Sequence, residues 1–395
     1  MSWPLVPLSQ VAEVNPCLPK GYDENQQVSF LGMASVSVQG EITSEETRVL
    51  AETKKGFTYF ERGDVLLAKI TPCFENGKAV HANDLKHRIG YGSTEFHVLR
   101  SKNGVLDAKY MFYMVWSDQF RFLGGKAMKG AAGQKRVSAD FLKEFNIPLP
   151  PLAEQKRIAA ILDKADSLRR KNQQAIQLAN QFLRAVFLDM FGDPVTNPKG
   201  WDEVELKEIA DIRSGVTKGK KIDLSIAVTL PYMRVANVQD GYLDLSSIQN
   251  ITVSSNDAKK CQLEKGDILL TEGGDPDKLG RGYIWNNEIE NCIHQNHIFS
   301  VRINDKNKIR PEFLSAVIAS QRGKRYFLKV GKQTTGIATI NKSVLSEFNP
   351  FIPPIEIQDE FIASVNKANR IKQLFSKGEF NLFNALSQKA FAGEL

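Results

Sequence analysis

One domain-sized repeat runs through this sequence, and it limits the possible folds more than any other feature. Residues 144–155 and 347–358 share a Glu-Phe-Asn run, a later pair of prolines and a glutamine, with every matched residue 203 positions apart. Residues 63–67 and 266–270 repeat a Gly-Asp-apolar pattern at the same offset. Solenoid repeats are roughly 20–50 residues long, so a period of 203 residues indicates duplication of a whole domain. Such a duplication suggests one task performed twice.

The start of each copy repeats as well. Residues 3–14 match residues 201–212 at an offset of 198, and the small drift indicates loop insertions. In both copies a proline pair, at 150–151 and at 353–354, separates a globular stretch from a helical one, because proline interrupts strand pairing and is tolerated at a helix start. We therefore expect four parts, namely globular domains at residues 1–151 and 192–352 and long helices at residues 152–191 and 353–395.

Composition permits a nucleic-acid partner without demanding one. The 395 residues include 52 Lys and Arg against 45 Asp and Glu, a net charge of +7 that is spread along the chain. No run approaches the roughly 18 apolar residues of a membrane span, and the N-terminus lacks the pattern of a secretory signal. The four cysteines have no paired spacing, which argues against a disulfide framework or zinc site. We expect a cytoplasmic protein.

The globular parts mix short strands with helices. Short apolar runs typical of strands occur at residues 28–31, 65–68, 96–99 and 298–301. Residues 110–122 and 311–327 have the pattern of helices. Because strands and helices do not alternate regularly as in βαβ units, the sequence predicts an α+β fold.

The first helical part carries a heptad pattern. Its seam positions alternate in steps of four and three: Ile158, Ile161, Ala165, Leu168, Asn172, Ala175, Ala179, Phe182 and Val186. A polar residue at a seam, here Asn172, can fix register and partner number. The alternative is an amphipathic helix with Asn172 at its edge. From Leu152 to Met190 the helix would measure roughly 58 Å at 1.5 Å per residue, and Gly192 would end it.

The second helical part is less regular. It keeps the seam at Phe361, Val365, Ala368, Ile371, Phe375, Leu382 and Ala385, but Gly378 interrupts it and predicts a bend or break near residues 377–378. Two such helices can cover their apolar stripes by packing antiparallel, which would give the duplicated fold pseudo-twofold symmetry. The predicted helix–helix and partner interface comprises Ile158, Ile161, Ala165, Leu168, Asn172, Phe182, Val186, Phe361, Val365, Ile371, Phe375 and Leu382.

Motifs for catalysis are missing from the sequence. There is no Gly-x4-Gly-Lys-Ser/Thr phosphate loop and no Gly-x-Ser-x-Gly nucleophile elbow. His294 and His297 have the spacing of metal ligands but no third ligand nearby, so we interpret them as structural. We expect a chain that binds no metal and catalyses no reaction.

Loops rich in Lys, Gln, Thr and Gly recur at residues 124–136 and 331–336. Lys and Arg neutralise phosphates, Gln and Arg can hydrogen-bond base edges, and Gly lets the backbone approach closely. A solvated turn is the more common interpretation of either loop alone, and the recurrence in both copies places a function beside it as an equal alternative. The candidate DNA contacts are Lys69, Thr71, Lys78, Lys126, Lys129, Gln134, Lys135, Arg136, Arg213, Ser214, Thr217, Lys218, Lys220, Lys221, Arg234, Asn237, Lys278, Arg281, Lys332, Gln333, Thr334 and Thr335.

Together these features resemble the DNA-specificity subunits of type I restriction–modification systems. The resemblance rests on the tandem duplication and on four segments: residues 68–78, the Pro-Pro-Leu-Ala-Glu-Gln strap within residues 147–155, the Met-Phe-Gly-Asp-Pro junction within residues 190–201, and the closing Ala-Phe-Ala-Gly-Glu-Leu at residues 390–395. It covers the whole chain. The second strap, at residues 355–360, departs from the pattern, so contacts of the first strap are not carried over to it.

The resemblance implies two target-recognition domains, each reading half of a split site in double-stranded DNA, with paired helices that set the spacer and dock two modification subunits. Those subunits would carry S-adenosylmethionine and methylate adenine. Restriction subunits would add an ATP- and magnesium-dependent endonuclease, in a bacterium or archaeon. Because the two globular parts diverge in sequence, the site should be asymmetric. A coiled-coil scaffold without a DNA role and a standalone DNA-modifying enzyme are the alternatives, and the missing catalytic motifs argue against the enzyme.

Overall fold

The computed structural model describes residues 3–131, 133–219, 223–274, 279–334, 337–376 and 379–395. Its contacts divide the chain into two compact units. The first unit combines Met1–Gln174 with Phe375–Leu395, and the second is Ala175–Leu374. The long helix α6 (Leu152–Phe191) therefore contributes its first part to the first unit and its last part to the second.

The first unit is built from short strands and helices in the following order: β1 (Leu5–Pro7), α1 (Leu8–Val11), β2 (Ala12–Val14), β3 (Gln27–Leu31), the 3₁₀ helix η1 (Met33–Ser35), β4 (Glu46–Val49), α2 (Leu50–Thr53), β5 (Thr58–Glu61), β6 (Val65–Ala68), β7 (Ala79–His81), β8 (Ile89–Gly92), β9 (Phe96–Ser101), α3 (Ala108–Trp116), α4 (Asp118–Ala127), α5 (Ala139–Glu144) and β10 (Asn146–Pro148). The start of α6 and the C-terminal helix α13 (Glu379–Ala392) complete it.

The second unit repeats this order with additional strands: β11 (Asp202–Glu203), α7 (Leu206–Ile209), β12 (Ala210–Ser214), η2 (Leu224–Ile226), β13 (Ala227–Met233), η3 (Val235–Asn237), β14 (Val238–Gln239), β15 (Tyr242–Leu243), β16 (Gln249–Ser254), α8 (Ser255–Cys261), β17 (Ile268–Thr271), β18 (Gly273–Gly274), β19 (Gly282–Ile284), β20 (Ile293–His294), β21 (Ile298–Ile303), α9 (Pro311–Ala319), α10 (Gln321–Val330), β22 (Lys332–Thr334), β23 (Ile337–Thr339), α11 (Lys342–Ser346) and β24 (Phe351–Ile352). Helix α12 (Ile355–Ser376) follows β24.

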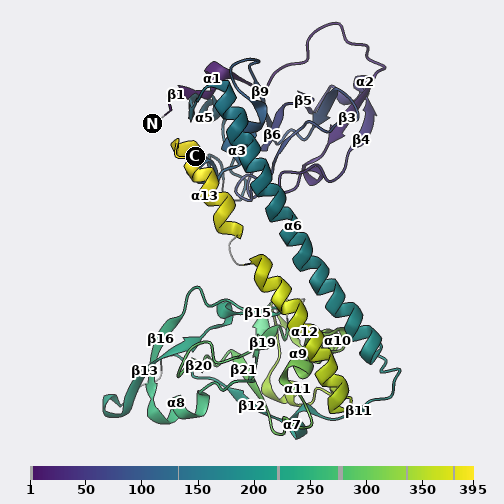
Figure 1. Cartoon of the computed structure of the whole chain (residues 1–395), viewed down its shortest axis with the longest axis vertical. Coiled ribbons are helices and arrows are strands. Elements are labelled where there is room, and N and C mark those ends of the chain that lie inside the picture. Colours follow the sequence, from purple (N-terminus) through teal and green to yellow (C-terminus); the bar gives the residue numbers. More distant parts are fainter. Residues whose placement is uncertain (1–2, 132, 220–222, 275–278, 335–336, 377–378) are drawn as a thin grey trace. The chain divides into compact units, whose positions relative to one another are not determined.

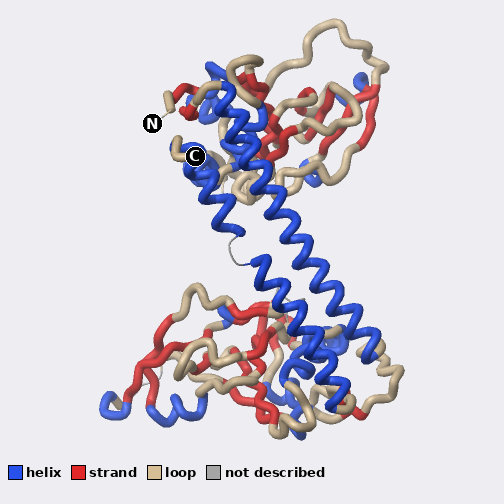
Figure 2. Tube along the Cα trace, in the orientation of Figure 1, coloured by secondary structure: helices blue, strands red, loops and turns tan. Residues whose placement is uncertain are grey.

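The sheets of the two units correspond, which confirms the predicted α+β duplication. The antiparallel sheet β2-β9-β6-β7 has its counterpart in β12-β21-β17-β19. A second sheet, β4-β3-β8-β5, matches β16-β13-β20, and each contains one parallel pair, β3 with β8 and β13 with β20. In each unit most helices lie near α6 and the sheets lie farther from it, with α2 and α8 out among the strands (Figures 1 and 2).

The repeated Gly-Asp motif forms the same turn in both units. Gly63 and Gly266 have φ angles of 94° and 96°, which a residue with a side chain rarely adopts. Asp64 accepts a hydrogen bond from the Glu61 backbone N–H, and Asp267 accepts one from Glu264. Each aspartate is almost fully buried and is held by two nitrogens of one arginine on the neighbouring strand. These pairs are Arg100 with Asp64 and Arg302 with Asp267.

The repeated glutamine of the strap is a buried clasp in both units. Gln155 accepts a hydrogen bond from the Asp107 backbone N–H and donates two, to the carbonyl oxygens of Val105 and Pro150. Gln358 makes the same three bonds with Arg310, Lys308 and Pro353. The glutamine thereby fixes the start of each long helix to the loop before α3 or α9. This explains why the residue recurs with the proline pair.

Within each unit, the C-terminal helix runs antiparallel to its part of α6 (Figure 1). In the second unit, Phe361 of α12 lies 5.6 and 5.4 Å, between ring centroids, from Phe187 and Phe191 of α6. In the first unit, Phe383 of α13 packs on Tyr113 and Trp116 of α3. The bend predicted at residues 377–378 falls outside the described residues, on either side of which α12 ends and α13 begins.

The heptad seam needs correction. Ile158 and Asn172 are buried as expected, but Leu168 and Phe182 remain 49 % and 53 % exposed, and Phe187 and Phe191 make the contacts with α12. An undistorted helix turns about 20° per heptad away from a 3.5-residue repeat, so a strict seam drifts off the buried face along a helix of 40 residues. Within the described part of the chain, no helix combines the length and apolar character needed to cross a membrane.

Candidate nucleic-acid interface

Each predicted loop belongs to a β-hairpin, and the two hairpins occupy equivalent positions in the two units. In the first unit, Lys129 pairs antiparallel with Arg136, which also pairs with Ile70 just after β6. In the second unit, β22 pairs with β23, and β23 pairs with β18 just after β17. The second strand of each hairpin, which we call its returning arm, therefore lies beside the segment that follows the Gly-Asp strand, β6 or β17. The paired residues of that segment, Ile70 and Gly273, are 203 positions apart, which is the offset of the repeat.

In the first unit, most predicted contacts gather at this hairpin. Lys126 lies in the last turn of α4 with its ammonium 4.2 Å from the ring centroid of the exposed Phe122. Of the predicted contacts, Lys129, Gln134, Lys135 and Arg136 lie in the hairpin itself and are exposed. Thr71 holds the loop of the hairpin, because its hydroxyl donates to the Gly133 carbonyl and accepts from the Lys135 N–H, both at 3.1 Å.

One predicted residue of the first unit has an internal partner. The Lys78 ammonium donates to the Met33 carbonyl oxygen at 3.0 Å, so it joins two segments of the unit. Lys69 remains at the hairpin, where its backbone N–H donates to Glu95 and its carbonyl accepts from Val137.

In the second unit, three predicted contacts also have internal partners. Arg213 donates to the buried Asp267 at 3.1 Å, and Arg234 donates to the Ser247 carbonyl at 2.8 Å. Asn237 is 2 % exposed, and its amide donates to the carbonyl oxygens of Asp244 and Ser247. The interpretation of Asn237 as a base contact is therefore corrected, since its amide is enclosed and used within the unit.

The other predicted residues of the second unit fall into three groups. Ser214, Thr217 and Lys218 are exposed on and after β12, and Arg281 is half-buried before β19. Lys332, Gln333 and Thr334 form β22. Lys220, Lys221, Lys278 and Thr335 lie outside the described residues.

The structure adds polar residues that were not among the predicted contacts. Glu95 accepts two hydrogen bonds from Arg136, from Nε at 3.0 Å and from Nη2 at 2.8 Å. These bonds lower the pKa of the Glu95 carboxyl and raise that of the Arg136 guanidinium. In the second unit, the His297 Nδ1 lies 2.6 Å from the Glu272 carboxylate. Glu95 immediately precedes β9, and His297 immediately precedes β21. Alignment of the two copies at these strands would have identified Glu95 and His297 as equivalent positions.

The two histidines of the His-x-x-His pair have separate surroundings. His294 is buried, its Nδ1 lies 3.0 Å from the Cys261 carbonyl oxygen, and burial lowers the pKa of its imidazole to about 4. His297 is exposed and faces Glu272 instead. These partners agree with the structural interpretation of His294.

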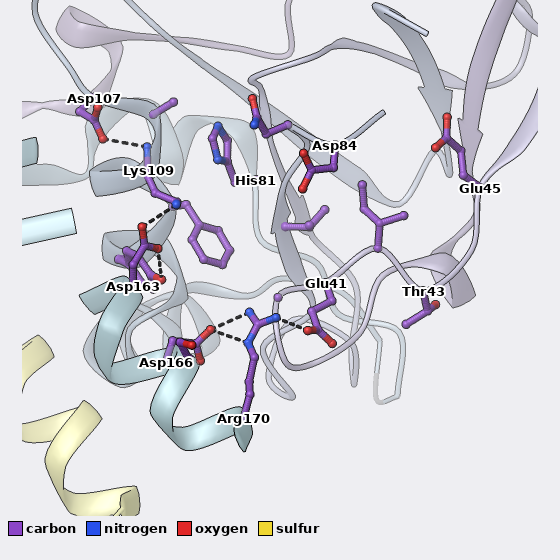
Figure 3. Close-up of a pocket in the computed structure, with 18 of the residues that line it drawn as sticks. Glu41, Thr43, Glu45, His81, Asp84, Asp107, Lys109, Asp163, Asp166 and Arg170 are labelled. Atoms are coloured by element: carbon purple, nitrogen blue, oxygen red, sulfur yellow. Dashed lines mark hydrogen bonds and ion pairs between the residues drawn. The ribbon is translucent and has the colours of Figure 1, made fainter. Parts of the chain in front are cut away.

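A large cleft of about 1210 Å³ lies in the first unit, between α3, the start of α6 and two loops (Figure 3). Its charged lining consists of Glu41, Glu45, Asp84, Asp107, Asp163 and Asp166 against Lys109, Arg170 and the imidazole of His81, whose pKa is lowered by burial. Lys109 pairs with Asp163 at 2.5 Å, and Arg170 joins Asp166 of its own helix to Glu41. An excess of carboxylates repels phosphates, so this cleft is a poor nucleic-acid site and the hairpin is the better candidate.

Comparison with known proteins identifies the fold and the family. The model of the type I restriction modification DNA specificity domain matches residues 2–179 and again residues 198–372. The EcoEI and EcoAI type I restriction enzyme specificity subunits of Escherichia coli are each 36 % identical over 189 residues, which cover 47 % of this chain and 32 % of theirs. The StySPI specificity subunit of Salmonella potsdam is 28 % identical over 279 residues, covering 64 % of this chain and 58 % of its own length.

Solved structures share the fold over nearly the whole chain. The type I restriction-modification S subunit from M. genitalium superposes with a TM-score of 0.54 at 16 % identity, covering 98 % of this chain and 96 % of that one. A chain solved in a study of the assembly and conformational transition of a type I R-M system gives 0.52 at 20 % identity, covering 100 % and 98 %. The sequence alignments, by contrast, span about a third of the EcoEI and EcoAI subunits. With both of its halves matched by the family model, the chain belongs to the type I restriction modification DNA specificity domain family.

Proposed function

We propose that this chain is the DNA-specificity subunit of a type I restriction–modification complex and that it is not itself catalytic. Each unit would read one half of a bipartite sequence in double-stranded DNA. One observation carries this proposal: the two units share the same sheets, Gly-Asp turn, glutamine clasp and hairpin, but differ in the side chains at the hairpin. Two units with the same backbone framework but different side chains at the hairpin are suited to bind two different DNA sequences.

The hairpin of the first unit has the chemistry for DNA contact. Its exposed lysines, Lys129 and Lys135, and Lys126 in the preceding helix α4 can neutralise phosphates. The side chains of Gln134 and Arg136 can hydrogen-bond base edges. Because α6 joins both readers in one chain, binding of the second half-site becomes intramolecular once the first is bound. Different side chains in the two units would make the recognised site asymmetric.

We also propose that the long helices dock two modification subunits. Large apolar side chains that remain exposed along these helices mark partner surfaces, namely Leu168, Leu178, Phe182, Leu188, Ile371, Leu374 and Leu382. Of the interface residues predicted from sequence, Ile158 and Phe361 are buried within their own units, where Phe361 contacts α6, so they are not available to a partner. The modification subunits would bring S-adenosylmethionine and methylate adenine. Restriction subunits would add ATP- and magnesium-dependent cleavage.

Co-expression with a cognate modification subunit tests the proposal. Sequencing of methylated bases in the host genome should reveal one bipartite motif without twofold symmetry, and a palindromic motif would contradict the assignment of different half-sites to the two units. DNA binding by the purified complex should weaken steeply as salt rises, because Lys and Arg contacts release counterions. A complex that binds no DNA at low salt would instead support the scaffold alternative.

A further inference from the structure

The base of the hairpin presents an equivalent set of three side chains in each unit. In the first unit the Lys69 N–H donates to the Glu95 carbonyl, and the Val137 N–H donates to the Lys69 carbonyl, both at 2.9 Å. In the second unit Glu272 makes the same two backbone bonds, with His297 at 3.0 Å and Ile340 at 2.8 Å. The returning arm thus places Arg136 in one unit where Thr339 stands in the other. We call these residues the hairpin triplets: Lys69, Glu95 and Arg136 in the first unit, and Glu272, His297 and Thr339 in the second.

The two triplets differ in charge although their backbones match. The first contains two cations and one carboxylate. The second contains one carboxylate hydrogen-bonded to an imidazole, with a neutral threonine in place of the arginine. Replacing Lys69 by Glu272 reverses the charge at the residue that follows the Gly-Asp strand. A merely structural element repeated in two copies has no need for this reversal, whereas readers of two different sequences do.

Arg136 is held in one orientation while part of its guanidinium stays available. Its Nε and Nη2 donate to the two oxygens of Glu95, and Nη1 donates to the Gln134 carbonyl at 3.3 Å. A guanidinium has five N–H groups, so these three bonds leave one N–H on each Nη. The Arg136 side chain is 43 % exposed and the Glu95 side chain 27 %. A carboxylate behind an exposed guanidinium reduces the freedom that the arginine loses on binding.

Resting on the proposed function, we infer that Arg136, positioned by Glu95, reads a guanine in the first half-site. Arginine donating two hydrogen bonds to guanine O6 and N7 is the commonest specific contact in the major groove, and the free N–H on each Nη matches it. In the second unit no arginine occupies the place. Glu272 offers a carboxylate instead, which accepts from the amino group of cytosine. The two triplets therefore select different bases at equivalent positions.

Base-substituted oligonucleotides test this inference in the complex with the modification subunit. The motif is first established for the wild type by sequencing methylated DNA, and methylation rates are then measured on oligonucleotides with each base of the motif replaced. Arg136→Ala should slow methylation of the cognate sequence by roughly 5- to 150-fold, the range for one lost bidentate contact. It should also abolish the preference for guanine at one position of one half-site. Glu95→Gln and Arg136→Lys, which keep the size of their side chains, should weaken that preference by less.

Arg88→Ala is the matched control, because it removes the same charge from a side chain of the first unit that is 75 % exposed. This control should leave every base preference unchanged. The inference is overturned if Arg136→Ala keeps full preference at every position, whether its rates are normal or uniformly reduced, because Arg136 would then only neutralise charge or brace the hairpin. Failure of the proposed function looks different: the wild-type complex itself would show no sequence-specific methylation.

Discussion

Replacing the buried Gln155 by glutamate tests whether the glutamine clasp fixes the start of α6 to the rest of the first unit. The Gln155 amide nitrogen donates to two carbonyl oxygens, at 3.0 Å to Val105 and 2.9 Å to Pro150. Gln155→Glu keeps the size and the acceptor for Asp107 but turns this donor into an oxygen facing two other oxygens. Loss of two buried hydrogen bonds, with their acceptors left unsatisfied, should cost about 2–5 kcal/mol of unfolding free energy.

Differential scanning calorimetry of the purified chain measures this cost. At roughly 2–4 °C per kcal/mol for a domain of 150–250 residues, unfolding of the first unit should shift down by about 4–20 °C. Gln174→Glu is the matched control, because Gln174 is exposed on the same helix, and surface substitutions usually change stability by no more than about 0.5 kcal/mol. Equal unfolding temperatures for the two variants would refute the clasp.

The pH dependence of the Gln155→Glu cost adds a second check. Only the protonated carboxyl can donate to one of the two carbonyls, and burial disfavours the charged form, so the pKa of the introduced carboxyl in the folded variant should lie above its unfolded value. The destabilisation relative to wild type should therefore be smallest below the unfolded pKa and should increase as pH rises through the folded pKa. A difference that stays constant with pH would show that the introduced carboxyl is not buried.

Three further predictions concern other parts of the chain. Asp64→Asn should lower the free energy of unfolding by about 3–5 kcal/mol, because it leaves the Arg100 guanidinium without its buried partner. Urea denaturation measures this free energy, and a change under about 1 kcal/mol would contradict the prediction. Burial lowers the pKa of His294, so on acidification the unfolded state binds the proton before the folded state does. The free energy of unfolding should therefore fall by up to about 1.4 kcal/mol per pH unit as pH drops from 6.5 towards about 4. His294→Gln should reduce this pH dependence, and an unchanged slope of unfolding free energy against pH would argue against burial of His294 as its cause. Phe182→Ser should reduce the amount of modification subunit that the purified chain captures. Gln181→Ser, one residue earlier and also exposed, should not. Equal capture by both variants would remove Phe182 from the proposed docking surface.

Part of the candidate interface could be predicted from the sequence, because the residue patterns that mark it are local or occur in both copies. Two matching Lys- and Gly-rich loops were predicted, and the structure shows that each belongs to a hairpin beside the segment after the Gly-Asp strand. Asn237 was assigned wrongly to the DNA contacts, and the internal partner of Arg213 was not foreseen, because an isolated Arg or Asn carries no sign of the buried carboxylate or backbone carbonyls that engage it. The pairing of Arg136 with Glu95 was missed for the same reason, since 41 residues separate the two side chains.

Local patterns in the chain were enough to establish the duplication, the α+β class and a continuous helix from Leu152, because repeats, proline pairs and apolar periodicity act over short distances along the sequence. Tertiary contacts were needed to show that each unit takes part of α6 together with one of the helices that follow β24. They also settled which apolar side chains of α6 are buried, since a straight helix turns relative to its heptad pattern. Hydrogen bonds between distant segments, such as the two glutamine clasps, then give both units one framework on which different side chains are presented.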